Sequence, residues 1–215
     1  MNCCCPHSRS AGRFFSLFAR RYRKRFEHKG FEPSQKQLIE GLDAIGYREN
    51  SILEIGSGVG HLHQTLLERG ARSAVGVDLA PKMLAEARRW ADERALGERV
   101  DYLEGDFVDH AGEIERADIA ILDKVICCYP NAGRLVRDSL AKTRRGYAFT
   151  VPRERWFVRL AVGTLAFAMR ILCSKFRPYV HDIEGIDTLI VDAGFEQHFE
   201  ASTAFWLTRV YQRAV

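Results

Sequence analysis

A chain of 215 residues is long enough for one large domain, or for a domain with an appendage. Hydrophobic residues make up 47% of it and charged residues 28%, which excludes a disordered, collagen-like or wholly coiled-coil chain. The formal charge of +4 is unevenly spread, because residues 1–29 hold eight lysines or arginines and one glutamate, which leaves −3 for the rest. A basic N-terminal extension therefore precedes a mildly acidic body.

The extension, residues 1–33, mixes basic and aromatic side chains in the run RFFSLFARRYRKRF over residues 13–26. Three interpretations stay open: a helix folded over the mouth of a ligand site, an amphipathic helix on anionic lipid, or an arm for phosphate backbones. Cys3, Cys4, Cys5 and His7 could ligate a soft metal or be acylated. Adjacent cysteines cannot easily all reach one ion with tetrahedral geometry, so we expect no metal site.

The cysteines of the chain are clustered rather than spaced as in a disulfide framework, and Cys127 and Cys128 are adjacent in an apolar run. Together with the lack of a recognisable signal peptide, this predicts a reduced, cytoplasmic setting. Cysteines at the end of a buried strand behave as small hydrophobes more often than as reactive thiols, and we interpret this pair in that way.

Past the extension, residues 34–46 predict a short helix with Ser34 as its N-cap and Gly46 at its end. From residue 51, strands predicted over 51–55, 73–78, 99–106 and 117–129 alternate with helices, the first two over 61–69 and 81–96. A helix near 133–142, a strand over 146–151, a helix over 186–195 and two tail strands follow.

The inner strands are almost continuously apolar, as expected for a parallel sheet covered by helices on both faces. The predicted fold is therefore α/β: a Rossmann-like three-layer sandwich with a mostly parallel seven-stranded sheet that ends in an antiparallel pair. The main domain spans residues 34–215, with a helical extension before it and a helical insert at about 153–180, after the fifth strand.

The run ILEIGSGVG places Gly56, Gly58 and Gly60 directly after the first strand and before a helix. Glycines there let the backbone turn sharply and approach a ligand at the carboxyl end of the strand. Asp78 ends the second strand, where a carboxylate can accept both hydroxyls of a ribose. The dinucleotide fingerprint needs a third glycine at position 61, and His61 stands there.

With these features, residues 50–212 resemble the class I S-adenosylmethionine-dependent methyltransferases. ILEIGSGVG is similar to the family's first motif, VGVDLAPKML to the second and EGDF to the third. ILDKVICCYP departs from the Asn-Pro-Pro-Tyr motif of enzymes that methylate amide or ring nitrogens. The chain looks more similar to the small-molecule branch that includes ubiquinone-pathway and magnesium-protoporphyrin methyltransferases, to which RPYVH adds a loose likeness.

The resemblance implies the cofactor S-adenosylmethionine and a set of residues that bind it. Asp78 would bind the ribose, Leu79 would pack on the adenine, Asp106 would lie near the adenine amine, and Phe107 would lie beside its ring. The remaining predicted cofactor contacts are Glu54, Gly56, Ser57, Gly58, Gly60, His61, Met83 and Asp123.

Methyl transfer from a sulfonium is a direct displacement, so alignment of the reactants does most of the work and a base is needed only for a protonated acceptor. The catalytic candidates are Asp123, Tyr129 and His181, near the carboxyl ends of the strands. The alternatives are a solvated carboxylate for Asp123 and a structural hydrogen bond for His181.

The apolar stretch Trp156 to Cys173 is about long enough to cross a bilayer, but Arg159 and Arg170 lie inside it and disfavour a spanning helix. We expect a helix packed over the active site, lining an apolar pocket with Trp156, Phe157, Leu160, Leu165, Phe167 and Met169. Peripheral membrane contact through residues 13–26 or 156–173 is the alternative.

The sequence thus predicts methyl transfer to a small apolar acceptor, at oxygen. The alternatives are an RNA methyltransferase, a nucleotide-cofactor oxidoreductase and a non-catalytic methyltransferase-like partner subunit. No DNA is expected as a partner, and RNA is disfavoured because the chain carries no separate RNA-binding module.

Overall fold

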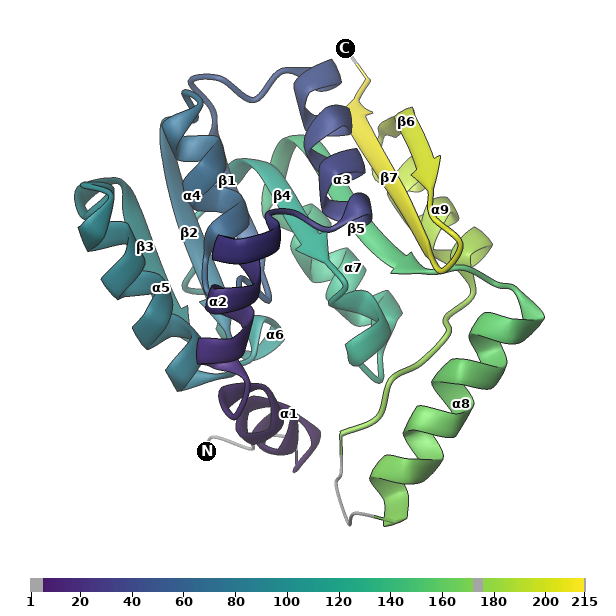
Figure 1. Ribbon diagram of the computed structural model, residues 1–215. Coiled ribbons are helices and arrows are strands. Elements are labelled where there is room, and N and C mark those ends of the chain that lie inside the picture. The colour runs from purple at the N-terminus through teal and green to yellow at the C-terminus, as the bar shows by residue number, and fades with distance from the viewer. Residues whose placement is uncertain (1–5, 172–175, 215) are drawn as a thin grey trace.

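The structure, a computed structural model that describes residues 6–171 and 176–214, is built around one seven-stranded sheet in the order β3-β2-β1-β4-β5-β7-β6 (Figure 1). Cys3, Cys4 and Cys5 lie outside the described residues. The strands are β1 (Ser51–Ile55), β2 (Ser73–Asp78), β3 (Val100–Glu104), β4 (Ala117–Asp123), β5 (Thr143–Pro152), β6 (Phe195–Ser202) and β7 (Trp206–Arg213). The first five run parallel, whereas β7 pairs antiparallel with both β5 and β6.

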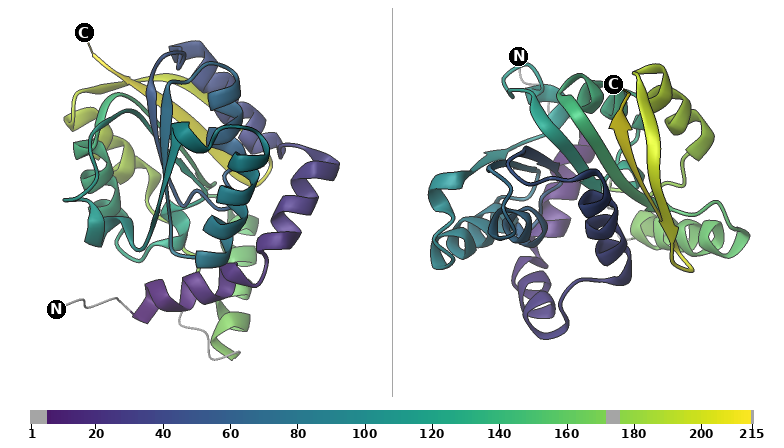
Figure 2. Two further views of the ribbon diagram at one scale, coloured as in Figure 1. Left: turned by 90° about the vertical axis from the view of Figure 1, so that its left-hand side faces the viewer. Right: turned by 90° about the horizontal axis from the view of Figure 1, so that it is seen from above.

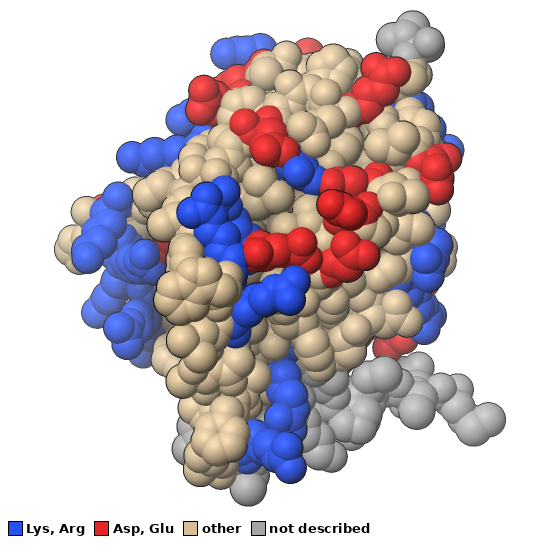
Figure 3. Space-filling model, turned by 90° about the vertical axis from the view of Figure 1, so that its right-hand side faces the viewer, with Lys and Arg blue, Asp and Glu red and all other residues tan. Residues whose placement is uncertain are grey.

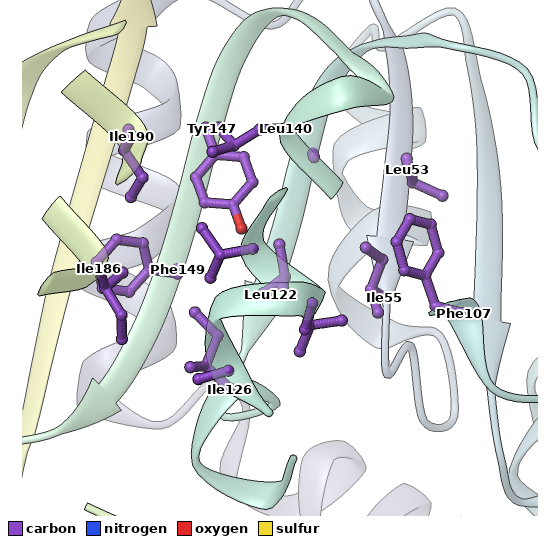
Figure 4. Close-up of a cluster of buried hydrophobic side chains, with 14 of the residues drawn as sticks. Leu53, Ile55, Phe107, Leu122, Ile126, Leu140, Tyr147, Phe149, Ile186 and Ile190 are labelled. Carbon is purple, nitrogen blue, oxygen red and sulfur yellow. The ribbon is translucent and has the colours of Figure 1, made fainter. Parts of the chain in front are cut away.

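Helices cover both faces of the sheet, which explains why its inner strands are apolar on both sides (Figure 2). One face packs against α3 (Pro33–Ile45), α4 (His61–Glu68) and α5 (Pro81–Glu93). The other face packs against α6 (Phe107–His110), α7 (Ala132–Ala141) and α9 (Ile183–Asp192), and Figure 4 shows part of that core. The predicted Rossmann-like three-layer sandwich is confirmed.

The sheet places the carboxyl ends of β1 and β4 next to each other at the point where the strand order reverses. The chain leaves β1 towards β2 and β3 on one side and returns to β4 and β5 on the other. Ligands of open α/β sheets bind in the crevice at such a switch point. The glycine-rich segment after β1 therefore enters the position where a ligand would lie.

The N-terminal extension forms α1 (Pro6–Ser16) and α2 (Ala19–Lys29), which lie across this carboxyl edge. Arg23 of α2 bonds Glu93 of α5 at 2.5 Å, and the Phe26 ring lies 5.3 Å from that of Trp90. Ala19 is buried with Val59 beside the glycine loop. Of the three interpretations of the extension, the structure has the helix folded over the site.

Several predicted boundaries are wrong. The last helix, predicted over 186–195, spans Ile183–Asp192, and Phe195 begins β6. Two further boundaries lie at the site. The helix α3 begins at Pro33 with Glu32 as N-cap, because proline fits the first helical position, and Ser34 is a buried residue of its first turn. The fourth strand ends at Asp123 rather than continuing to residue 129: Lys124 adopts a left-handed backbone with φ of 59°, and Cys127 and Cys128 lie on a short 3₁₀ turn.

The helix of the insert, α8 (Trp156–Ile171), lies where predicted, but it does not line an apolar pocket over the active site. Val158, Val162 and Met169 are buried, whereas Trp156, Leu160, Leu165 and Phe167 are exposed. The predicted apolar pocket lined by this helix is therefore wrong, because most of the side chains expected to line it point towards solvent. No helix within residues 6–171 and 176–214 is long and apolar enough to cross a membrane.

Candidate active site

A cavity of about 360 Å³ lies at the carboxyl edge, between the strand ends and the extension. Twelve of the predicted site residues line it: Glu54, Gly56, Ser57, Gly58, His61, Asp78, Leu79, Met83, Asp106, Phe107, Asp123 and Tyr129. Gly60 and His181 are not among its lining residues. The extension adds Ala11, Phe15, Tyr22, Arg25, Phe26, Gly30 and Glu32 to the lining.

The glycine loop is shaped by backbone conformations that favour glycine. Gly56, Gly58 and Gly60 all have positive φ, at 69°, 54° and 80°. A Cβ on Gly56 would lie 2.4 Å from Val125 Cγ2, whereas a Cβ on Gly58 would meet nothing within 4 Å. Gly56 is thus needed for close packing, and Gly58 leaves open space at the cavity wall.

Asp78 closes the loop from the end of β2. Its Oδ2 accepts a hydrogen bond from the Gly58 backbone N–H at 2.7 Å, and its Oδ1 accepts one from the Ala80 N–H at 2.8 Å. Burial raises the pKa of Asp78 to about 6, and the two backbone hydrogen bonds oppose that rise. The group is therefore mostly ionised at neutral pH and can accept further hydrogen bonds.

Glu54 is buried at the end of β1 and is bonded inside the protein. Its Oε2 accepts from the His63 backbone N–H at 3.1 Å and lies 2.6 Å from His63 Nδ1. The His63 N–H belongs to the first turn of α4, so a carboxylate of the chain already occupies that helix N-terminus. Burial raises the pKa of Glu54, opposed by the hydrogen bonds from His63.

Gln35, in the first turn of α3, joins two predicted site residues across the cavity wall. Its Nε2 donates to Asp123 Oδ2 at 2.8 Å and lies 3.0 Å from His61 Nε2. Burial lowers the pKa of His61 to about 4, so its imidazole is neutral at neutral pH. The His61 ring also stacks on Phe26 of the extension, with 4.7 Å between the ring centroids.

Lys124 ties the end of β4 to the extension. Its Nζ lies 2.5 Å from Glu32 Oε2 and 5.2 Å from the ring centre of Trp206. Glu32 also pairs with Arg25, at 2.5 Å. Although burial raises it, the pKa of Glu32 is lowered overall by its hydrogen bond and charge interaction with Lys124. The two cations that line the cavity are thus both paired with one carboxylate.

Tyr129 and His181 occupy different positions relative to the cavity. The Tyr129 hydroxyl donates to Asp106 Oδ1 at 3.2 Å, and burial raises its pKa, so the phenol stays protonated. The His181 Nε2 lies 3.0 Å from the Tyr129 carbonyl oxygen, and burial lowers the pKa of His181. His181 therefore contacts the backbone of the turn that carries Tyr129.

Comparisons with known proteins agree with this geometry. Residues 52–145 match the methyltransferase domain family. The ribosomal protein L11 methyltransferase of Haemophilus influenzae is 31% identical over 71 residues, which are 33% of this chain and 24% of that relative. The chain thus matches about a quarter of the length of this curated relative.

Among solved structures, magnesium protoporphyrin IX methyltransferase from Synechocystis PCC 6803 with bound SAM superposes with a TM-score of 0.71. It is 18% identical, and the alignment covers 100% of both chains. The same protein with bound SAH gives a TM-score of 0.68 at 21% identity, covering 94% of this chain and 96% of that one.

Residues 52–145 are thus a methyltransferase domain, within a Rossmann-like fold that the whole chain shares with methyltransferases of known structure. The resemblance found in the three sequence motifs is thereby confirmed.

The lining of this methyltransferase domain fits the cofactor. Three buried polar atoms at the cavity have no hydrogen-bond partner among the described residues: Ser57 Oγ, His61 Nδ1 and Asp123 Oδ1. Buried polar groups normally find partners, so these atoms have capacity for a polar ligand. The open space beside Gly58 leaves room for a ligand. The ionised Asp78 provides a hydrogen-bond acceptor at the position where the resemblance implies a ribose.

Sequence reasoning missed several residues that line the cavity. Gln35 and Trp206 come from helix and strand positions that carry no motif, and they reach the cavity only through the fold. The aromatic residues of the extension were visible in the sequence, but nothing in it indicated which of them would line the cavity.

Proposed function

We propose that this methyltransferase domain transfers the methyl group of S-adenosylmethionine to an oxygen of a small, apolar acceptor. The observation that carries the proposal is the division of the cavity lining. Four carboxylates and the glycine loop line it near the strand ends, whereas the extension contributes the aromatic rings of Phe15, Tyr22 and Phe26. Such a cavity suits a polar, cationic cofactor next to an apolar acceptor.

The charges of the lining favour a cationic cofactor over a dinucleotide. Five acidic residues and two basic residues line the cavity, and His61 is neutral. A sulfonium is stabilised by such surroundings, whereas a pyrophosphate would be repelled. A pyrophosphate would also need the N-terminus of α4, where Glu54 already accepts the His63 N–H. These points argue against an oxidoreductase.

For the cofactor contacts, we propose that the Asp78 carboxylate accepts the ribose hydroxyls while its own backbone bonds keep it in place. Leu79, Met83 and Phe107 supply apolar surface to the adenine. Asp106, which caps α6 by accepting the Val108 N–H, lies beside them. Ser57 and His61 provide the unpartnered atoms nearest the glycine loop.

The bound cofactor would supply an already activated methyl group, so the residues of the chain need to align the acceptor and manage one proton. Asp123 is the proposed catalytic residue, because Gln35 fixes its Oδ2 and leaves its Oδ1 unpartnered. Tyr129, protonated, is proposed as a hydrogen-bond donor rather than a base. His181 is proposed as a positioning residue that holds the turn of Tyr129.

The acceptor would lie among Phe15, Tyr22, Cys128 and Trp206. These side chains offer aromatic and apolar surface, and the cations beside them, Arg25 and Lys124, are already paired with Glu32. An uncharged or weakly acidic acceptor suits this lining better than a polyanion does. A phenol or a carboxylic acid on an apolar skeleton is the proposed substrate class.

The cofactor proposal is tested by calorimetric titration of the purified chain with S-adenosylmethionine, S-adenosylhomocysteine and NAD. We expect binding of the two sulfur cofactors and none of NAD. Asp78→Asn should weaken that binding at least about tenfold, because a charge-assisted hydrogen bond contributes about 1.5–3 kcal/mol. Asp101→Asn, on the exposed side of β3, is the matched control and should leave the affinity unchanged. Binding of NAD alone would reject the proposal.

The acceptor proposal is tested by methyl incorporation from labelled S-adenosylmethionine into a panel of apolar phenols and carboxylic acids, with total RNA as a comparison. We expect turnover of panel members and none of RNA. Asp123→Asn should lower kcat for the phenols by about 10²–10⁴, the usual contribution of a positioned acid or base, and should lower it less for the carboxylic acids, which carry no proton at neutral pH. Cofactor binding that persists in this variant would separate the loss of catalysis from a loss of folding.

A further inference from the structure

The helix α8 exposes an apolar stripe, which we name the apolar ridge: Trp156, Leu160, Phe167 and Ile171. Their exposed fractions are 77%, 64%, 65% and 66%. The spacing of four, seven and four residues places all of them on one side of the helix, opposite the buried Val158, Val162 and Met169. Monomeric proteins rarely leave such a run of large apolar side chains in water, and it marks an interaction surface.

The charges around the apolar ridge are basic. Arg159 and Arg170 are exposed on α8, and the helix contains no aspartate or glutamate. By helical spacing the two arginines follow one edge of the ridge. Arg159 lies 3.7 Å from Glu154, which precedes the helix and is the acidic residue nearest to it in the chain. The ridge therefore combines apolar side chains with positive charge along its length.

The basic extension lies on the same end of the molecule. Met169 of α8 packs with Ala11 of α1 and with Phe176, whose ring stacks on Phe14 with 5.4 Å between centroids. Arg21 and Lys24 of α2 are exposed. Figure 3 shows this face: a tan column projects in its lower part, where α8 lies, blue side chains flank it, and the red side chains gather above it.

We propose that the apolar ridge and its basic flanks dock the chain on an anionic phospholipid surface. The ridge would insert Leu160 and Phe167 among the acyl chains, while Arg159 and Arg170 contact lipid phosphates. Trp156, at the N-terminal end of the ridge, has the amphipathic ring that membrane interfaces favour. The docked helix lies in the plane of the interface and does not span it.

The charges favour lipid over a second copy of the chain. In a symmetric antiparallel pair of α8 helices, Arg159 of each copy would approach Arg170 of the other, with no acidic residue of α8 between them. Like charges facing each other oppose such an interface. An anionic lipid surface instead offers negative charge at the depth where the arginines would lie and an apolar interior for the ridge.

The test is flotation of the full chain with vesicles of phosphatidylcholine alone or mixed in equal parts with phosphatidylglycerol, at low and high salt. We expect the partition coefficient to be at least about tenfold higher for the anionic vesicles, because each Lys or Arg near such a surface contributes about 1 kcal/mol. High salt should reduce this difference. The tryptophan emission should shift to the blue on binding, and Trp156→Phe should lose most of that shift.

The decisive variant is Leu160→Glu combined with Phe167→Glu. Both side chains are exposed, so the fold should persist, and vesicle partition should fall at least about tenfold. Val191→Glu, at a side chain of α9 that is 56% exposed, is the matched control and should bind as the parent chain does. Sedimentation of the free protein measures self-association in parallel.

Two results would overturn the proposal. One is vesicle binding that is absent, or that the double variant leaves undiminished. The other is a dimer that dissociates in the double variant while the parent chain ignores vesicles, which would assign the ridge to a second copy. The test needs no cofactor or acceptor, so its outcome is independent of the proposed methyl transfer.

Discussion

The two walls of the cavity are built in different ways. The sheet wall, which comprises Gly56, Ser57, Gly58, Asp78 and Asp123, is fixed by main-chain bonds: the N–H groups of Gly56 and Ser57 donate to Val77 oxygen at 2.7 and 3.0 Å. The leader wall, which comprises Phe15, Tyr22, Arg25, Phe26 and Glu32, is attached through side chains such as the Glu32–Lys124 pair.

This difference in construction indicates what each wall contributes to ligand binding. Backbone geometry held by a sheet is preorganised, whereas partly exposed side-chain contacts open at a lower free energy. We therefore expect the sheet wall to set the affinity for the cofactor and the leader wall to set how fast ligands enter and leave. Four predictions test that division, from the largest expected effect to the smallest.

The largest effect is expected at the sheet wall, for Gly56→Ala. The new Cβ would lie 2.4 Å from Val125 Cγ2, at a φ of 69° that alanine adopts only with strain. The free energy of unfolding should fall by about 2–4 kcal/mol, from the left-handed backbone and the overpacking together. Urea denaturation measures it.

Gly58→Ala is the matched control, because its Cβ meets nothing within 4 Å although its φ is 54°. The free energy of unfolding should fall by only about 1–2 kcal/mol, the cost of the left-handed backbone alone. Cofactor binding should also weaken, because the new methyl group would occupy open space at the cavity wall. Equal losses of stability in the two variants would show that the loop is not held against Val125.

At the leader wall, Phe26→Ala should release the extension without unfolding the sheet. Phe26 has ring contacts at 4.7 Å to Phe31 and to His61 and at 5.3 Å to Trp90. Losing them should cost about 2 kcal/mol of docking free energy, since each aromatic pair contributes about 0.5–1.5 kcal/mol. Trypsin should then cleave after Arg20 or Arg21 about thirtyfold faster. Leu17→Ala, at an exposed position, should not change that rate.

The pH dependence of cofactor binding should follow Asp78. Its pKa of about 6 means that the acceptor carboxylate is lost as pH falls, so affinity should drop about tenfold between pH 7.5 and pH 5. The stability of the free protein should respond to this group in the opposite direction. A carboxyl whose pKa is raised in the folded protein binds its proton more tightly there than in the unfolded chain. The free energy of unfolding should therefore rise as the pH decreases through 6 towards 4, because the cost of burying the charged form is removed.

Asp78→Asn isolates both effects, because the side chain can no longer ionise. Calorimetry should show a cofactor affinity that no longer changes between these pH values. If the parent chain and the variant lose affinity in parallel, a different group controls binding.

The smallest effect is expected for the link between the walls. Lys124→Gly loses the ion pair with Glu32 but relieves a left-handed backbone, and the two terms should offset within about 1 kcal/mol. Lys124→Ala loses the pair and keeps the strain, so it should be about 1 kcal/mol less stable than Lys124→Gly. Urea denaturation of both variants gives the difference, and an alanine variant as stable as the glycine variant would argue against strain at this position.

The sheet wall could be predicted from the sequence and the leader wall could not. The glycine loop and Asp78 depend on local backbone rules: glycine at positive φ, and a carboxylate at a strand end. The contacts of the leader wall depend on the whole fold, because its Glu32 pairs with Lys124, which is 92 residues away in the chain. No periodicity indicates such a pair.

The wrong predictions have similar causes. The apolar run at 156–171 shows that a helix forms but not which side faces the body, since large apolar side chains occur on both its buried and its exposed side. The run over 117–129 reads as one strand because apolar residues resume after Asp123 and Lys124, and the sequence does not show that the backbone of Lys124 turns there. The roles of Asp123, Tyr129 and His181 remain predictions.

The first turn of α3 links the sheet wall to the leader wall. Gln35 closes the first turn of α3 by accepting the Glu32 N–H at 3.1 Å, and both residues also contact cavity groups. Any ligand that redirects Asp123 or Lys124 therefore alters the start of a helix. Hydrogen–deuterium exchange at the first-turn amides of α3 should slow when the cavity closes and quicken when it opens, so that the backbone amides of this helix report whether the cavity is occupied.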